Sequence, residues 1–211
     1  MIILSHRGCW GGNIEKNSQA SFERSFELGF GIETDVRDYK GELVISHDIA
    51  NKDCILVQDL FEIYAKYNNS FPLALNIKSD GLQVKLKRLI LKYGVKNYFI
   101  FDTSIPDGLG YLRHNFNYFT RQSEYEPSPA FYDISAGVWI DEFKSHWVTA
   151  NDISQHMDNN KMVSIVSPEL HGRSYKKEWK HYQEIQELLG IKDMMLCTDY
   201  PEEARRFFYD K

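Results

Sequence analysis

The chain has 211 residues, 43% of them hydrophobic, which is enough to bury one sizeable core, and a single domain over residues 1–211 is expected. Its formal net charge is -5 and it contains no block of lysine and arginine, so nucleic acid is not an expected partner. The three cysteines are widely spaced, which is typical of reduced thiols and argues against a disulfide framework or a zinc site.

The N-terminal segment has no basic region ahead of its apolar residues and is too short to be a signal peptide. No apolar run approaches the roughly 18 residues that a membrane-spanning helix needs. We therefore expect a cytoplasmic protein without an integral membrane segment. Composition does not indicate the oligomeric state.

Apolar runs alternate with helix-like stretches along the whole chain. Parallel strands need a crossover connection, and the intervening stretches have the pattern of helices. The alternation predicts an α/β fold, a single (β/α)8 TIM barrel, with an open doubly wound sheet as the alternative. The runs predict strands at residues 2–5, 31–36, 73–77, 97–101, 117–120, 136–140, 162–166 and 194–197.

Local signals refine this outline. Asn17 and Ser18 are suited to cap the first helix, whose apolar residues recur at spacings of three and four. The turn at residues 38–41 leads to a small extra strand at residues 43–46, inserted after the second barrel strand. Residues 121–133, with two prolines, predict a loop or a short irregular helix.

Two acidic residues interrupt the apolar run at residues 30–36. In a strand, Glu33 and Asp35 project from the same face because side chains alternate. Adjacent carboxylates repel each other unless a proton or a cation lies between them. Ligation by oxygen alone suits a hard cation, so the pair predicts a Mg²⁺ or Ca²⁺ site.

Basic side chains occur at the ends of nearby predicted strands. His6 and Arg7 end the first strand, and His47 follows the extra strand. An arginine offers a planar fork of donors to a phosphate group, and imidazoles exchange protons near neutral pH. Together with a cation, these residues indicate phosphoryl chemistry. His114, His146, His156 and His181 lie in helix-like or loop stretches, and no role is predicted for them.

These motifs resemble the glycerophosphodiester phosphodiesterase family over nearly the whole chain, although residues 105–190 match only in general layout. The motifs that carry the resemblance occur in the right order, and they are His6-Arg7-Gly8, Lys16-Asn17-Ser18, Ile32-Glu33-Thr34-Asp35-Val36, His47-Asp48, Leu75-Asn76-Ile77-Lys78, Phe101-Asp102 and Thr198-Asp199-Tyr200-Pro201.

The resemblance implies a phosphodiester hydrolase that releases glycerol 3-phosphate and an alcohol, with His6 and His47 as the acid–base pair. It further implies that Arg7 binds phosphate and that Lys78 either binds phosphate or extends to solvent. Trp139 either lines the alcohol side of the pocket or packs in the core, and Glu169 either lines the pocket or stabilises a polar turn.

Two positions depart from the family pattern. Asn76 stands where the third acidic metal ligand is expected, and Lys16 stands where a glutamate is expected before Asn17; Glu15 is offset by one residue from that position. Glu33, Asp35 and Asn76 are thus the expected metal ligands. Two alternatives stay open, namely a lyase- or phospholipase-type cleavage that gives a cyclic phosphate, and a catalytically silent barrel that binds phosphoesters. The leaving alcohol, whether derived from a lipid or linked to a saccharide, is not predicted.

Overall fold

The structure is a computed structural model that describes residues 1–67 and 70–210. Within these residues, eight parallel strands alternate with helices in the (β/α)8 TIM barrel fold, and a ninth strand, β3, pairs antiparallel with β2. The predicted fold class and the extra strand are both confirmed. The chain divides into two compact units, Ser5–Tyr118 and Met1–Leu4 with Phe119–Lys211. Whether they form a single domain stays a prediction.

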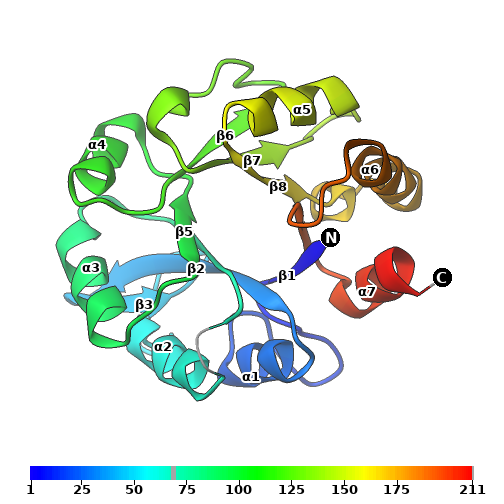
Figure 1. Ribbon diagram of the computed structural model, residues 1–211. Helices are drawn as coiled ribbons and strands as arrows, with labels where there is room; N and C mark the ends of the chain where they lie inside the picture. The colour runs from blue at the N-terminus through cyan, green and yellow to red at the C-terminus, as the bar shows by residue number, and fades with distance from the viewer. Residues whose placement is uncertain (68–69, 211) are drawn as a thin grey trace. The chain divides into compact units, whose positions relative to one another are not determined.

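The unit Ser5–Tyr118 contains the strands β5, β4 and β2 in this order, with β3 attached to β2, and it includes the last two residues of β1. In Figure 1 its helices follow one another along the outer side of these strands. The elements are β1 (Ile2–His6), α1 (Gln19–Glu27), β2 (Gly31–Tyr39), β3 (Glu42–Ile45), α2 (Val57–Lys66), β4 (Leu73–Ile77), α3 (Gln83–Lys92), β5 (Tyr98–Phe101) and α4 (Ile105–Arg113).

The second unit contains the remaining strands in the order β9-β8-β7-β6. Its helices α6 and α7 contact each other through Trp179, whose ring lies 5.6 Å from that of Phe207. The elements are β6 (Phe119–Ser123), η1 (Tyr132–Ile134), β7 (Gly137–Asp141), α5 (Ala150–Asp158), β8 (Met162–Val166), η2 (Pro168–His171), α6 (Lys176–Leu189), β9 (Met195–Thr198) and α7 (Pro201–Tyr209).

Capping and burial explain where the first helix begins and which face it buries. Ser18 caps α1, because its hydroxyl accepts a hydrogen bond from the Ser21 backbone while the Ser21 side chain binds the Ser18 N–H. Phe22 and Phe26 lie one turn apart and are both buried. The loop that joins β1 to α1 contains Arg7, Gly8 and the motif residues 16–18.

The strand predicted at residues 117–120 is shifted. Tyr118 forms only an isolated bridge with Ile100, and β6 runs from Phe119 to Ser123. The last three residues of β6 are polar, so the sequence carries no apolar signal for them. The loop predicted at residues 121–133 is accordingly shorter, and it contains the irregular helix η1.

Candidate active site

The turn after β1 presents Arg7 next to the end of β2. Arg7 has a left-handed backbone conformation, with φ of 56°, and its N–H donates to the Glu33 carbonyl over 2.8 Å. Gly8 follows with φ of 83°, and a Cβ at this position would lie 2.4 Å from the Ser21 Oγ. Only glycine fits here, and it lets the chain pass close to α1 while the Arg7 side chain turns toward β2.

Asp35 is the most heavily contacted carboxylate of the site. It is 1% exposed, and its Oδ2 lies 3.1 Å from the Arg7 Nε and 2.9 Å from the Asn17 Nδ2. Its Oδ1 lies 3.4 Å from the Lys78 Nζ. The Thr34 hydroxyl donates to the Asn17 Oδ1 over 2.8 Å, which fixes the orientation of this amide. Two cationic side chains therefore converge on one buried carboxylate.

Glu33 lies on the same strand and is 3% exposed, but its contacts differ. Its Oε2 accepts no hydrogen bond, and the His6 Nε2 lies 3.9 Å from it. Burial, together with the negative charge of Asp35, raises the pKa of Glu33 to about 8. A bound cation would relieve both effects.

Asn76 extends from β4 beside Asp35, its partner in the parallel register between β2 and β4. The Asn76 Nδ2 donates to the Asp102 Oδ2 over 3.3 Å, whereas the Asn76 Oδ1 is buried and accepts no hydrogen bond. Glu33 and Asn76 thus each have one buried oxygen without a hydrogen-bond partner, on neighbouring strands. Such atoms call for an explanation, and a cation is one.

This donor set fits a hard divalent cation in kind, since carboxylate and amide oxygens are the ligands that Mg²⁺ and Ca²⁺ prefer. Among the described residues, no group of three or more His, Cys, Asp and Glu side chains is arranged as a metal site. Asn76 falls outside those residue types. The three predicted ligands therefore lie on adjacent strands, with Asp35 already paired to cationic side chains.

His47 follows β3, and the chain is held there by the backbone hydrogen bond from Ser46 N to the Asp35 carbonyl, 3.0 Å. The His47 Nδ1 lies 2.8 Å from the Asp48 Oδ1, and this hydrogen bond lowers the pKa of Asp48. The carboxylate favours the tautomer with hydrogen on Nδ1, which leaves Nε2 to accept a proton. The His47 side chain is 45% exposed and thus accessible to a substrate.

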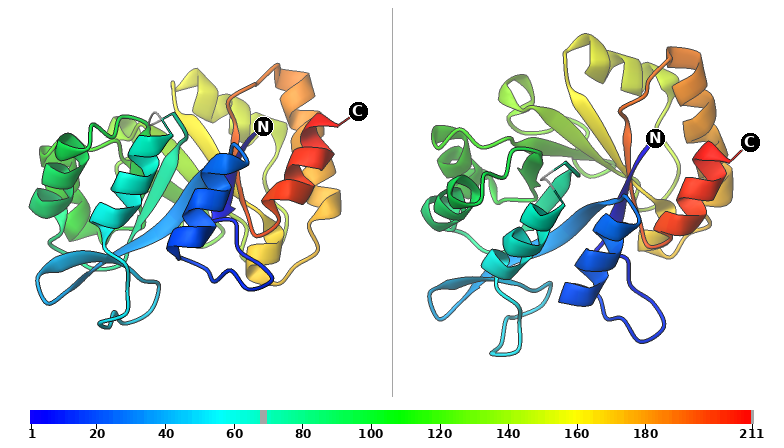
Figure 2. Two further views of the ribbon diagram at one scale, coloured as in Figure 1. Left: turned by 90° about the horizontal axis from the view of Figure 1, so that it is seen from below. Right: turned by 60° about the horizontal axis from the view of Figure 1, so that its bottom comes forward.

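Arg7 and His47 line the same pocket, of about 560 Å³. The hairpin of β2 and β3 and the segment after it form one wall, and the loop that leads to α1 forms another. Figure 2 shows both segments extending on the same side of this unit. Glu15 and Lys16 also line the pocket, so the side chains that depart from the family pattern face the same space.

Trp139 and Glu169 belong to the other unit. Trp139 lies in β7 and is 3% exposed. Glu169 lies in η2, where the Ser167 and Thr198 hydroxyls and the Asp199 N–H donate to its carboxylate. Burial raises the pKa of Glu169. Within this unit, Glu169 connects the ends of β8 and β9, and the substrate roles of both residues stay predictions.

Sequence reasoning assigned Asn17 only to a motif and a helix cap, and it overlooked the contact with Asp35. Asp102 was likewise not recognised as the partner of the Asn76 amide. The available signal for Asn17 was its position one residue before the cap of α1, in the loop that leads from β1 to this helix. No local pattern indicated the pairing of Asn76 with Asp102, because it joins β4 to the residue that follows β5.

The fold of this chain is similar to those of several solved structures. A glycerophosphodiester phosphodiesterase from Agrobacterium tumefaciens str. C58 matches with a TM-score of 0.67 at 13% identity, over 98% of each chain. One from Thermotoga maritima matches with a TM-score of 0.61 at 15% identity, over 97% of each chain. The fold is that of the glycerophosphodiester phosphodiesterases. The resemblance inferred from the sequence motifs is thereby confirmed for the fold.

A phosphodiesterase from Oleispira antarctica, solved in complex with the product sn-glycerol-3-phosphate, has a fold similar to that of this chain. It matches with a TM-score of 0.67 at 15% identity, over 98% of this chain and 96% of the other. No protein-family model matches the chain, and no curated protein gives a significant sequence match. Within the described residues, no helix is long and apolar enough to cross a membrane.

Proposed function

We propose that the protein is a metal-dependent phosphodiesterase that hydrolyses a glycerophosphodiester to glycerol 3-phosphate and an alcohol. The observation that carries this proposal is the convergence of Arg7 and Lys78 on Asp35 beside Glu33, with Arg7 and His47 lining one pocket. The shared fold and the glycerol 3-phosphate bound to the Oleispira antarctica enzyme support the substrate class.

Arg7 and Lys78 bind the phosphodiester. The Arg7 Nε faces Asp35, so the terminal nitrogens of the guanidinium remain for the non-bridging oxygens of the substrate. Asp35 holds the Arg7 guanidinium and is itself held by Asn17, which lowers the entropic cost of positioning the phosphate. Glu33, Asp35 and Asn76 would hold a divalent cation, Mg²⁺ or Ca²⁺, which when bound offsets the charge that develops on phosphorus-bound oxygens.

His6 and His47 transfer the protons. One imidazole, in its neutral form, accepts the proton of the attacking hydroxyl, and the other, in its charged form, donates a proton to the leaving alkoxide. The hydroxyl oxygen forms a bond to phosphorus while the bond from phosphorus to the alcohol oxygen breaks. Because the two imidazoles must differ in charge, activity should be bell-shaped in pH. A flat profile between about pH 5 and 9, with chemistry rate-limiting, would exclude this scheme.

The proposal is tested by incubating purified protein with a panel of phosphodiesters in the presence of Mg²⁺, Ca²⁺ or a chelator. Phosphorus NMR spectroscopy of the products then separates the alternatives. Glycerol 3-phosphate formed only with a divalent cation supports the proposal. A cyclic phosphate as the final product indicates a lyase instead. Binding of the diester without any product indicates a silent barrel, and either result would overturn the proposed reaction.

A further inference from the structure

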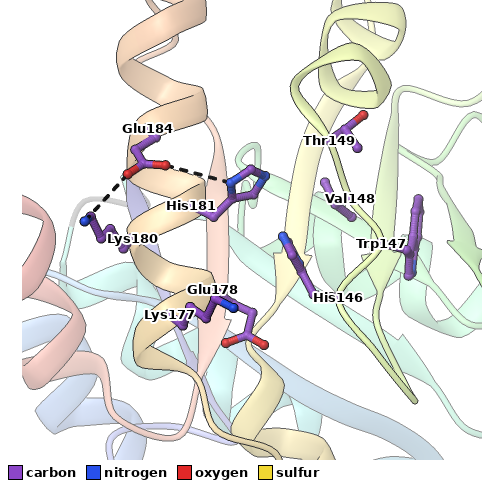
Figure 3. Close-up of a pocket in the computed structure, with 9 residues that line it drawn as sticks. All are labelled: His146, Trp147, Val148, Thr149, Lys177, Glu178, Lys180, His181 and Glu184. Carbon is purple, nitrogen blue, oxygen red and sulfur yellow. Dashed lines mark ion pairs between the residues drawn. The ribbon is translucent and has the colours of Figure 1, made fainter.

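A second pocket, of about 530 Å³, lies in the unit that contains Phe119–Lys211 (Figure 3). One wall is α6, and the other is the segment that links β7 to α5. His181 comes from the first wall and His146 from the second, and Figure 3 shows the two rings pointing toward each other. None of the residues that line this pocket belongs to the candidate active site.

A fully buried carboxylate fixes the orientation of His146. Glu142 is 0% exposed and accepts hydrogen bonds from the Trp147 N–H, the Val148 N–H and the Tyr182 hydroxyl. The His146 Nδ1 lies 2.9 Å from the Glu142 Oε1. Because a carboxylate only accepts hydrogen bonds, Nδ1 carries the hydrogen, and the lone pair of neutral His146 is on Nε2.

His181 also has a carboxylate near its Nδ1, but at a distance longer than a hydrogen bond. Its Nδ1 lies 3.9 Å from the Glu184 Oε2 on the same helix, and this contact is drawn in Figure 3. The His146 and His181 rings have centroids 4.8 Å apart and are inclined by 83°. Two imidazoles that bind one tetrahedral zinc ion, at Zn–N distances of about 2.1 Å, have ring centroids roughly 5 Å apart. A carboxylate beside the second ring nitrogen is also the usual partner of a metal-binding histidine.

Glu178 adds a second, independent observation. It lines the same pocket one helical turn before His181, and its side chain is only 14% exposed. Its Oε1 pairs with the Arg173 Nη2 at 3.2 Å, whereas its Oε2 is buried and accepts no hydrogen bond. A cation bound in the pocket would stabilise the negative charge of this incompletely hydrogen-bonded carboxylate.

We propose that this pocket binds a divalent cation of the zinc class through the Nε2 atoms of His146 and His181. Among the described residues, no three His, Cys, Asp and Glu side chains are arranged as a metal site, so water molecules complete the coordination shell and Glu178 contributes charge. Imidazole ligands select zinc and similar ions over Mg²⁺ and Ca²⁺. The chain would then hold two cation sites of different preference, and this second site does not depend on the proposed phosphodiesterase activity.

The test is a Zn²⁺ titration monitored by long-range ¹H–¹⁵N NMR spectroscopy of the seven histidine side chains, in excess Mg²⁺. The Nε2 signals of His146 and His181 should move together and saturate at one equivalent of Zn²⁺. His181→Gln should weaken Zn²⁺ binding at least about tenfold, as loss of a ligand or its partner does in other metal sites. His181 is the residue to replace because its side chain is 41% exposed on the surface of α6, whereas His146 is bound to the buried Glu142.

His114→Gln is the matched control, since His114 is an exposed histidine at the end of α4 and lines neither pocket. It should leave the Zn²⁺ affinity unchanged, and circular dichroism should verify that both variants are folded. The proposal is overturned if the two Nε2 signals stay in place, if His181→Gln binds Zn²⁺ as tightly as the wild type, or if binding requires millimolar Zn²⁺, as expected for isolated surface histidines.

Discussion

The contacts of single side chains separate the acidic residues of the candidate site into two groups. Each oxygen of Asp35 already has a cationic partner, and one of them also accepts a hydrogen bond from an amide. Glu33, in contrast, has an oxygen that accepts no hydrogen bond. Asn76 resembles Glu33 in this respect. The buried oxygens that lack partners are therefore those with most to gain from a cation.

Asn76→Glu tests whether this position faces the cation. A third carboxylate adds one negative charge to the ligand set, and we expect Mg²⁺ or Ca²⁺ binding to the free protein to tighten roughly tenfold. Without cation the variant should be less stable, because the new carboxylate lies near Glu33 and Asp102. Calorimetric titration measures the affinity. Asn76→Gln is the control for side-chain length, and unchanged or weaker binding in a folded Asn76→Glu protein would mean that residue 76 does not face the cation.

His156 makes stability depend on pH. Its Nε2 lies 2.8 Å from the Gln122 Oε1 and its Nδ1 lies 2.8 Å from the Tyr132 hydroxyl oxygen, and burial lowers its pKa. The unfolded chain therefore binds this proton more readily than the folded one. The stabilisation is complete above the unfolded pKa of about 6.5 and is lost as the pH falls through the lower, folded pKa.

Urea unfolding of the wild type and of His156→Gln between pH 7.5 and 5 tests this expectation. The free energy of unfolding should fall with pH more steeply in the wild type than in the variant, because glutamine does not titrate in this range. The exposed His114, replaced by glutamine, serves as the control and should leave the slope unchanged. Equal slopes in His156→Gln and the wild type would show that His156 does not titrate differently in the folded state.

Among the structural elements, the turn between β1 and α1 requires a glycine at position 8. Gly8→Ala would combine a positive φ with a Cβ 2.4 Å from the Ser21 Oγ. Gly12→Ala is the matched control in the same loop, since Gly12 also has a positive φ but nothing within 4 Å of its Cβ position. We expect Gly8→Ala to cost at least about 2 kcal/mol more than Gly12→Ala, which should cost about 1 kcal/mol. Thermal unfolding of both variants measures this, and equal costs would contradict the close packing of this turn against α1.

The elements were predictable from the sequence where periodicity and burial agree. The strands that became β1, β2, β4 and β8 lie within three residues of their predicted ends, because each contains an apolar run, although charged residues interrupt the run in β2. β6 was predicted too early, since its polar second half is specified by pairing with β7. Tertiary pairing of this kind leaves no trace in local composition.

The residues proposed for the candidate site stay predictions, and the contacts among them could not be predicted from the sequence. Arg7 was singled out because it follows the first apolar run, and Glu33 and Asp35 because they interrupt the second one. Which cation pairs with which carboxylate depends on distances across strands and loops, so the contact of Asn17 with Asp35 was missed. The buried Glu142 and its partner His146 lie in a loop, where no periodicity marks burial.

For the molecule as a whole, the fold is shared with glycerophosphodiester phosphodiesterases at 13–15% identity. Such a fold carries many arrangements of side chains, so activity must be argued from the site. In this chain every residue proposed to bind phosphate, to hold the Mg²⁺ or Ca²⁺ ion or to transfer protons in the phosphodiesterase reaction lies in the unit Ser5–Tyr118. The second unit contributes the pocket between α6 and the segment after β7.

The most direct test of the proposed phosphodiesterase is the turnover of a glycerophosphodiester, with Mg²⁺ or Ca²⁺, by His6→Ala and His47→Ala. Each variant should lose about two to four orders of magnitude in turnover, the usual contribution of a general acid or base, and should remain folded. His114→Ala, a replacement outside both pockets, should turn over like the wild type. Near wild-type turnover in either His6→Ala or His47→Ala would contradict the two-histidine mechanism.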